Sequence, residues 1–382
     1  MSRKVPDGWT ECKLRDIADI KMGQSPKSES YNNSGEGLPF LQGSRTFGSR
    51  YPLIDTYCTD PKIIANEGEI LFSVRAPVGD INIADKKICI GRGLASLNAK
   101  NQQNLFLFYL LHFIKDDIIN LESGTVFGSV NKKDLESVPI LLPTLPEQRA
   151  IASIFPPIED KIELLRQENE TLEAMAETIF KQWFIKDPEN KEVLLKDIYV
   201  FEKGFEPGSS NYLETEEDNT IRFIRLKDMD NKNSSIFIKK SLAKNICVPD
   251  DLLVAFDGSP GKIGFGIEGA FSSGIRKVYS IHETYNNVWL KYLIFKSKPI
   301  QNTIKTYSTG TIIQHAGSCI DKLTFKFPEE SKIKEFNELI TPIFIKIQQN
   351  KQQLQTLSQL FDTLLHGLMS GELRVDDALC QS

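Results

Sequence analysis

Apolar residues recur with alternating spacings of four and three along two long stretches of the chain. This heptad pattern is typical of helices that pack in coiled coils. Because proline is tolerated in the first turn of a helix, we expect the two helices to begin at Pro156-Pro157 and at Pro342. The apolar positions are Ile158, Ile162, Leu165, Leu172, Ala176, Ile179 and Trp183 in the first stretch, and Ile343, Ile347, Leu354, Leu357, Phe361, Leu364 and Leu368 in the second.

Each stretch carries one asparagine in its apolar seam. Asn169 falls at an a-type position and Asn350 at a d-type position, and these layers face each other when the helices run antiparallel. Pairing the asparagines matches apolar with apolar in the other layers, for example Leu165 with Leu354, so the pair would select one register. We predict an antiparallel intramolecular coiled coil. The alternative is two amphipathic helices, each packed on its own domain; a disulfide between cysteines placed at 165 and 354 would distinguish them.

The segments before these helices have a different pattern. Short runs rich in β-branched residues, such as EILFSV and NIADKKICI, alternate with turns that contain Gly, Asn and Asp. Strand signals dominate up to about residue 97, and one amphipathic helix follows around 104–121. The pattern predicts a mixed α/β or α+β module with many exposed loops.

The chain repeats itself at offsets of 181 to 186 residues. LRDIADIKMGQSP (14–26) returns as LKDIYVFEKGFEP (195–207), GEILFSVRAPVG (68–79) as DDLLVAFDGSPG (250–261), and ESGTVF (122–127) as STGTII (308–313). A duplicated domain plus helix explains this, and the predicted fold class is α+β with a pseudo-two-fold internal repeat. We expect a first domain at 1–145, a helix at 146–187, a second domain at 188–328, and a second helix with the tail at 329–382.

The composition limits the possible binding partners and the cellular compartment of the protein. The chain of 382 residues has a net charge of -5, so it is not the basic protein that binding nucleic acid alone usually requires. Any such role needs a local patch or a partner that supplies phosphate contacts. No run of 18 apolar residues and no secretory start are found, and six cysteines are scattered without a CxxC pair. We expect a cytoplasmic protein that does not associate with membranes.

A search for enzyme and metal motifs gives no convincing match. GFGIEG (264–269) fits the letters of a dinucleotide motif but lies in a strand-like run, and SPGK (259–262) is not a complete phosphate loop. FPPI (155–158) serves better as a helix start than as a methyltransferase motif. The four histidines (His112, His282, His315 and His366) lack metal-ligand spacing. We therefore predict neither a catalytic site nor a metal or cofactor in this chain.

Polar loops are the remaining candidates for function. Arg, Lys, Gln and Asn have the geometry to contact base edges in a DNA groove, although each of these residues could equally belong to a solvated loop. The two halves have loops at the same positions but with different residues in them. This is expected of two domains that recognise different DNA sequences. The candidates are Gln24, Ser25, Lys27, Gln42, Arg45, Arg75 and Arg92 in the first half, and Arg225, Lys227, Asp257, Lys262, Arg276 and Lys277 in the second.

Six stretches of the chain resemble those of one known family: GQSP, LPFLQGS, GEILFSVRAPVGD, IGRGLASL, LPEQRAIASIFPPIEDKIELLRQENETLEAMAETIFKQWF and LQTLSQLFDTLLHGLMSGELRV. On these stretches the whole chain resembles the specificity (S) subunits of type I restriction–modification enzymes. It implies two target-recognition domains, each reading one half of a split site in double-stranded DNA, with the helices as a ruler. Two methyltransferase (M) subunits would bind the helices, restriction (R) subunits would join, and S-adenosylmethionine would be bound by the M subunit.

As a ruler, about thirty helical residues would span about 45 Å, somewhat more than one turn of B-DNA.

Other functions fit the same pattern. The recognition subunit of a type II-like system that cuts on both sides of its site would share this architecture. A coiled-coil scaffold that never touches DNA belongs to a different class, and an enzyme with an unrecognised site is a third alternative.

Overall fold

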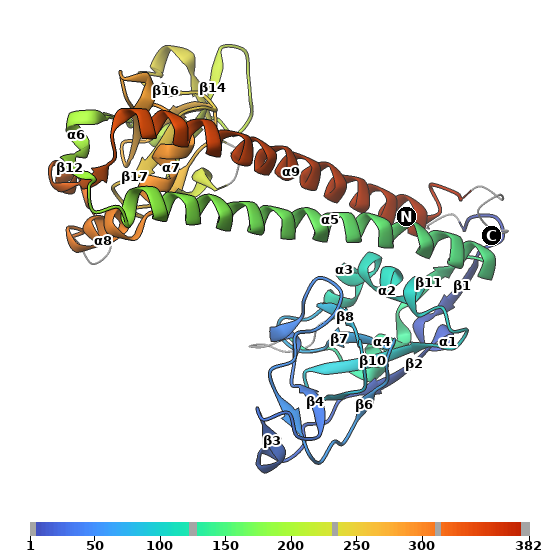
Figure 1. Cartoon of the computed structure of the whole chain (residues 1–382). Helices are drawn as coiled ribbons and strands as arrows, with labels where there is room; N and C mark the ends of the chain where they lie inside the picture. Colours follow the sequence, from blue (N-terminus) through green and yellow to red (C-terminus); the bar gives the residue numbers. More distant parts are fainter. Residues whose placement is uncertain (1–4, 122–127, 231–235, 310–314, 376–382) are drawn as a thin grey trace. The chain divides into compact units, whose positions relative to one another are not determined.

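The computed structural model describes residues 5–121, 128–230, 236–309 and 315–375 (Figure 1). The chain forms two compact units, the first made of residues 1–166 and 352–382 and the second of residues 167–351. Each unit therefore takes in part of both long helices, and the domain limits drawn from the sequence stay a prediction. The repeated segment ESGTVF lies outside the described residues, as does most of its counterpart STGTII. No helix among the described residues is both long and apolar enough to cross a membrane.

The first unit is built on three sheets whose strands come mainly from residues 10–99. One is an antiparallel pair, one has four strands in the order β2-β10-β7-β8, and one has five in the order β3-β5-β4-β9-β6. Its strands are β1 (Thr10–Lys13), β2 (Ala18–Met22), β3 (Tyr31–Asn32), β4 (Leu38–Leu41), β5 (Tyr57–Cys58), β6 (Ile64–Ala65), β7 (Ile70–Ser73), β8 (Ile81–Ile83), β9 (Ile88–Ile90), β10 (Leu94–Ala99) and β11 (Pro139–Leu142).

Short helices complete this unit. They are α1 (Leu14–Ile17), η1 (Ser28–Ser30), η2 (Ser44–Thr46), α2 (Asn104–Phe113), α3 (Lys115–Ile119) and α4 (Lys132–Ser137). The apolar face of α2 packs on the four-stranded sheet, and Phe72, Phe108 and Tyr109 are fully buried there. The same core takes in Phe155 and Leu368 from the two long helices, so the sheet and the helices share one core.

The second unit repeats this topology. The sheet order β13-β20-β17-β18 matches β2-β10-β7-β8, and β12-β21 matches β1-β11. The parallel pair of β4 and β9 also has its counterpart in β14 and β19. The internal repeat and the mixed α/β domains predicted from the sequence are thus confirmed. The strands are β12 (Lys191–Leu194), β13 (Val200–Lys203), β14 (Thr220–Ile224), β15 (Phe237–Lys239), β16 (Ile246–Cys247), β17 (Leu252–Ala255), β18 (Ile263–Gly264), β19 (Gly269–Phe271), β20 (Ile275–Tyr279) and β21 (Thr324–Phe327).

The helices of the second unit follow the same plan. The apolar face of α7 covers the sheet through Leu290 and Ile294, which are fully buried. The short helices are α6 (Leu195–Ile198), η4 (Ser209–Asn211), η5 (Leu226–Met229), η6 (Lys240–Leu242), η7 (Glu283–Tyr285), α7 (Val288–Lys296), α8 (Lys298–Thr306) and η8 (Gly317–Lys322).

The long helices begin earlier than the prolines indicated. Helix α5 spans Leu145–Phe180 and continues as a π-helical turn, η3 (Lys181–Ile185), and helix α9 spans Glu330–Ser370. The prolines at 156, 157 and 342 therefore lie inside the helices, and the prediction that they mark helix starts is wrong. Each proline removes one backbone N–H. Buried apolar side chains on either side of Pro342, such as Ile340 and Phe344, hold the helix in place there.

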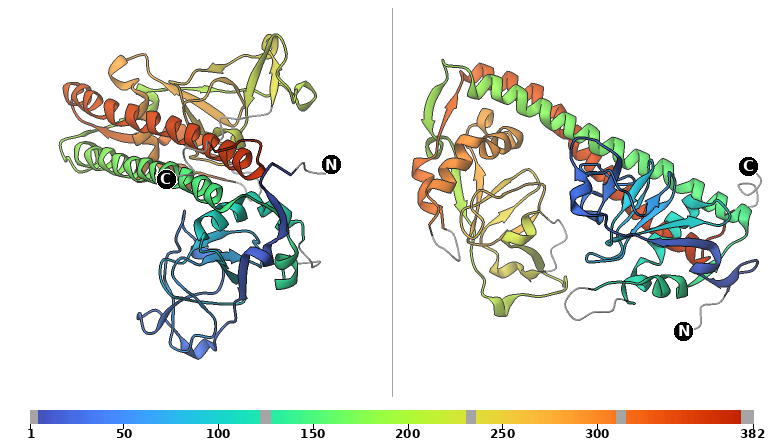
Figure 2. Two further views of the ribbon diagram at one scale, coloured as in Figure 1. Left: turned by 90° about the vertical axis from the view of Figure 1, so that its right-hand side faces the viewer. Right: turned by 90° about the horizontal axis from the view of Figure 1, so that it is seen from below.

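The two long helices run antiparallel as a coiled coil (Figures 1 and 2). In the second unit Asn350 donates from Nδ2 to Asn169 Oδ1 (3.0 Å) and to Glu168 Oε2 (2.9 Å). In the first unit the rings of Phe155 and Phe361 lie 5.2 Å apart, and Leu165 is buried. The predicted pairing of the two asparagines and the predicted coiled coil are both present.

Candidate nucleic-acid interface

Several strands of the first unit end at one place. The backbone N–H of Gly23, just after β2, donates to the Leu94 carbonyl (2.8 Å), and that of Gln24 donates to Ile90 (3.0 Å). The turn between β9 and β10 also meets the end of β4, because Gly93 N–H donates to the Gln42 carbonyl (3.0 Å). Three loops far apart in sequence are thus joined by backbone hydrogen bonds.

Four of the predicted residues meet in this junction. Ser25 Oγ donates to Gln42 Oε1 (2.9 Å) and accepts from the Arg92 backbone N–H (3.3 Å). Gln24 is the fourth, and its side chain is exposed like those of Gln42 and Arg92. A Cβ on Gly91 would lie 2.5 Å from Gln42 Oε1, so a larger residue at position 91 would displace the Gln42 side chain from its present position.

The other predicted residues of the first unit lie around the junction or apart from it. Val74 N–H donates to the Gly93 carbonyl (2.9 Å), which places Arg75 on the neighbouring turn, with its side chain exposed. Lys27 is exposed at the start of η1. Arg45 instead forms a surface ion pair with Asp55 (Nη2 to Oδ2, 2.5 Å) and does not join the cluster.

In the second unit four of the six predicted residues lie at the corresponding strand ends. Arg225 donates from Nε to Asp228 Oδ2 (2.9 Å), and Lys262 Nζ lies 2.5 Å from Asp230 Oδ2. Asp257 Oδ1 lies 2.9 Å from His315 Nδ1. Lys227 is exposed in η5. These loops thus mix positive and negative groups where the first unit has mainly neutral and positive ones.

Arg276 and Lys277 lie on strand β20, where the first is buried and the second is partly buried. Arg276 is only 8% exposed and donates from Nη1 to the Ser273 carbonyl (2.6 Å). Lys277 contacts Glu202 (2.8 Å) and donates to the Ile246 carbonyl (3.0 Å). A contact of these two with DNA stays a prediction. Lys277 connects β20 to β13 and β16, whereas Arg276 donates to carbonyls of its own turn.

A polar network that the sequence did not reveal anchors the first domain to helix α5. Arg50 Nη2 lies 2.6 Å from Glu159 Oε2 and Arg50 Nη1 3.3 Å from Asp160 Oδ1, while Tyr109 Oη donates to Glu159 Oε2 (2.6 Å). Burial alone would lower the pKa of Arg50, but the hydrogen bond and charge of Glu159 outweigh it and raise that pKa. Burial and Glu159 also raise the pKa of Tyr109. Arg50 is therefore charged and the Tyr109 hydroxyl keeps its proton at neutral pH.

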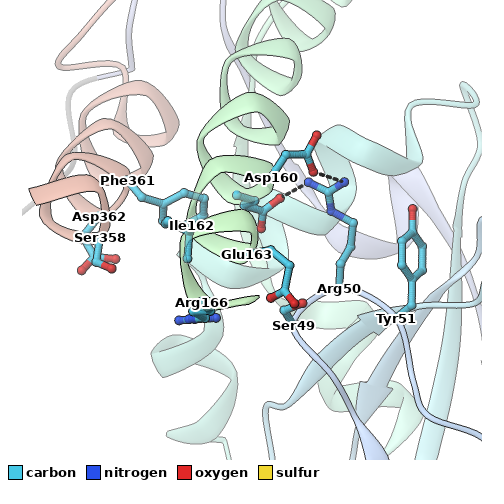
Figure 3. A pocket seen from close by; sticks show the side chains of 11 residues that line it. Ser49, Arg50, Tyr51, Asp160, Ile162, Glu163, Arg166, Ser358, Phe361 and Asp362 are labelled. Carbon is cyan, nitrogen blue, oxygen red and sulfur yellow. Dashed lines mark hydrogen bonds and ion pairs between the residues drawn. The ribbon is translucent and has the colours of Figure 1, made fainter. Parts of the chain in front are cut away.

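This network borders a hollow of about 360 Å³ (Figure 3). Loop 49–51 forms one wall, and the facing sides of α5 and α9 form the other, with Ile162 and Phe361 as its apolar part. In the sequence, Arg50 looks like any arginine of a polar loop, because its partner Glu159 lies 109 residues away. His315, the partner of Asp257, was missed for the same reason.

Comparisons with known proteins agree with the family suggested by the motifs. Residues 6–174 match the family described as the type I restriction modification DNA specificity domain. A putative type I restriction enzyme MjaX specificity subunit from Methanocaldococcus jannaschii is 47% identical over 180 residues, which are 46% of this chain and 42% of that protein. The MjaIX specificity subunit of the same organism is 24% identical over 98% of this chain and 95% of its own.

The fold is also found in a solved structure. The S subunit of a type I restriction–modification system from M. genitalium aligns over 97% of both chains with a TM-score of 0.70 and 18% identity. This likeness shows a shared architecture of two domains and long helices.

Proposed function

We propose that this chain, whose residues 6–174 match the type I restriction modification DNA specificity domain, is a specificity subunit that recognises a bipartite site in double-stranded DNA, with one domain for each half-site. The observation that carries the proposal is the junction of strand ends. The same backbone hydrogen bonds form this junction in both units, but the side chains in it differ. Two copies of one frame with different exposed groups suit the recognition of two different half-sites.

The chain acts as a non-catalytic subunit of a larger complex in this proposal. Two methyltransferase subunits dock on helices α5 and α9, restriction subunits join them, and S-adenosylmethionine is bound by the methyltransferase. The repeated organisation supports two equivalent docking positions. The net charge of -5 supports a partner that supplies much of the phosphate contact.

A comparison of DNA binding with and without the methyltransferase subunit tests this function. The complex is expected to bind and methylate one split sequence, which single-molecule sequencing of methylated adenines would identify. Substitutions in the junction of the first unit should alter one half-site only. A chain that binds its partner proteins but shows no sequence preference with them would support a coiled-coil scaffold instead.

A further inference from the structure

The two units can be matched position by position through their hydrogen bonds. Gly204 N–H donates to the Ile275 carbonyl (3.1 Å) as Gly23 does to Leu94, and Phe205 N–H donates to Phe271 (3.0 Å) as Gln24 does to Ile90. Phe256 and Gly274 likewise repeat the bond of Val74 and Gly93, with the same length of 2.9 Å. The junction of the second unit is therefore the structural equivalent of that in the first.

This correspondence identifies which side chains replace one another. Ser25 corresponds to Glu206, and Arg92 corresponds to Ser273. The bond between these positions is kept, since Glu206 Oε1 accepts from Ser273 N–H (3.0 Å) and from its Oγ (2.8 Å). Ser272 N–H donates to the Ile224 carbonyl (2.9 Å) as Gly91 does to Leu41, so Arg225 takes the place of Gln42.

Glu206 and Arg225 each use only part of the charged group in hydrogen bonds to the protein. Ser273 occupies Oε1 of Glu206, and Asp228 occupies Nε of Arg225 (2.9 Å). Within the described part of the chain, Oε2 of Glu206 and the two terminal nitrogens of Arg225 have no further hydrogen bond. Both groups flank the turn at Ser272-Ser273. Ser272 N–H donates to the carbonyl of Ile224, the residue before Arg225, and Ser273 donates to Glu206. An acceptor and a donor fork therefore stand close together in one junction.

We propose that Glu206 and Arg225 read one G·C base pair, with Glu206 accepting from the cytosine amino group and Arg225 donating to the guanine. The chemistry follows from the major groove, where cytosine presents an amino donor beside the O6 and N7 acceptors of guanine. Ser273 and Asp228 act as positioning residues that fix the two side chains. The inference rests on the proposed function and adds the base pair and the residues for one domain.

The test compares Glu206→Gln with Glu214→Gln, an exposed glutamate of the same domain, each in the full chain with its methyltransferase subunit. Glu206→Gln is expected to slow methylation of the original site by about tenfold or more and to relax one G·C pair of one half-site. Glu214→Gln should leave the methylated sequence unchanged. The thermal unfolding midpoint of each variant checks that the fold is intact.

The possible outcomes distinguish a failure of the base-pair inference from a failure of the proposed function. An unchanged sequence with Glu206→Gln overturns the inference while the proposed function stands. A uniform loss at all sites in a folded variant also overturns it, since that indicates a structural role. If the wild-type complex shows no sequence preference, the proposed function fails and the inference fails with it.

Discussion

A partly buried ion pair occupies the same place in both units, with its cation on different strands. In the first unit Lys21, on β2, lies 2.7 Å from Glu69 and donates to the Ile64 carbonyl (3.3 Å). In the second unit the lysine is Lys277, on β20, which donates to the Ile246 carbonyl and lies 2.8 Å from Glu202. Strand β20 corresponds to β10 of the first unit. The position of the charge is therefore exchangeable, while the chemistry of the site is kept.

The exchange can be reproduced in the first unit. Lys21→Glu should destabilise it by about 2–4 kcal/mol, because Glu69 is 4% exposed and would face a second carboxylate. Adding Ser96→Lys places the cation where the second unit has it and should restore at least half of the loss. Urea unfolding of the two single variants and the double variant measures the coupling. Additive losses in the double variant would refute the equivalence of the two arrangements.

Lys291 gives a prediction about pH. This lysine of α7 is 1% exposed, its Nζ donates to Asn286 Oδ1 (2.9 Å), and burial lowers its pKa from 10.5 to about 8. The cost of burying the charge is present in full below pH 8 and diminishes as pH rises toward 10.5, because the folded state then loses its proton first. Lys291→Met should stabilise the chain at pH 7 by about 1–3 kcal/mol.

The gain is expected to shrink as the pH approaches 10, which denaturant unfolding at several pH values would measure. Lys298→Met, which alters an exposed lysine at the start of α8, is the control and should change little. A gain for Lys291→Met that is equally large at pH 7 and pH 10 would show that charge burial is not its cause.

The predictability of the site differs from residue to residue. Gln24, Ser25, Gln42 and Arg92 could be predicted because each follows a buried strand in a polar loop with nearby glycines. Arg276 has a similar context in the sequence, but its guanidinium turns inward to backbone carbonyls. The direction of a side chain depends on partners distant in the chain, which no local pattern specifies.

At the scale of elements, the heptad pattern predicted the long helices and their pairing but not where they begin. Residues 145–155 of α5 lie on the core of the first unit, where Ile151 and Phe155 are buried, and this packing outweighs the cost of the two prolines that follow. Local propensity placed the start at Pro156, and tertiary contacts placed it eleven residues earlier, at Leu145.

The anchoring of the first domain to α5 gives a prediction with an internal control. Arg50→Met leaves Glu159 partly buried without its cation and should destabilise the first unit by about 1–3 kcal/mol. Arg45→Met removes an arginine from the same polar segment, but its pair with Asp55 is exposed to solvent and should contribute much less to stability. Chemical denaturation of the two variants compares them, and equal effects would exclude an anchoring role for Arg50.

At the scale of the whole molecule, each long helix contributes to both units, so the length of the helices can set the distance between half-sites. Inserting one heptad between Arg166 and Gln167 and another between Gln352 and Gln353 preserves the register set by Asn169 and Asn350. Seven residues add about 10.5 Å, which is close to three base pairs of B-DNA.

The doubly extended chain, with its methyltransferase partner, should therefore methylate the same two half-sites with a spacer about three base pairs longer. A heptad inserted in only one helix sets Asn169 against an apolar layer and should lower both stability and methylation. This control separates the effect of helix length from that of the sequence change. Mapping methylated adenines in cells that carry each variant measures both outcomes. An unchanged spacer in the doubly extended chain would mean that the helices join the two domains without measuring the DNA between them.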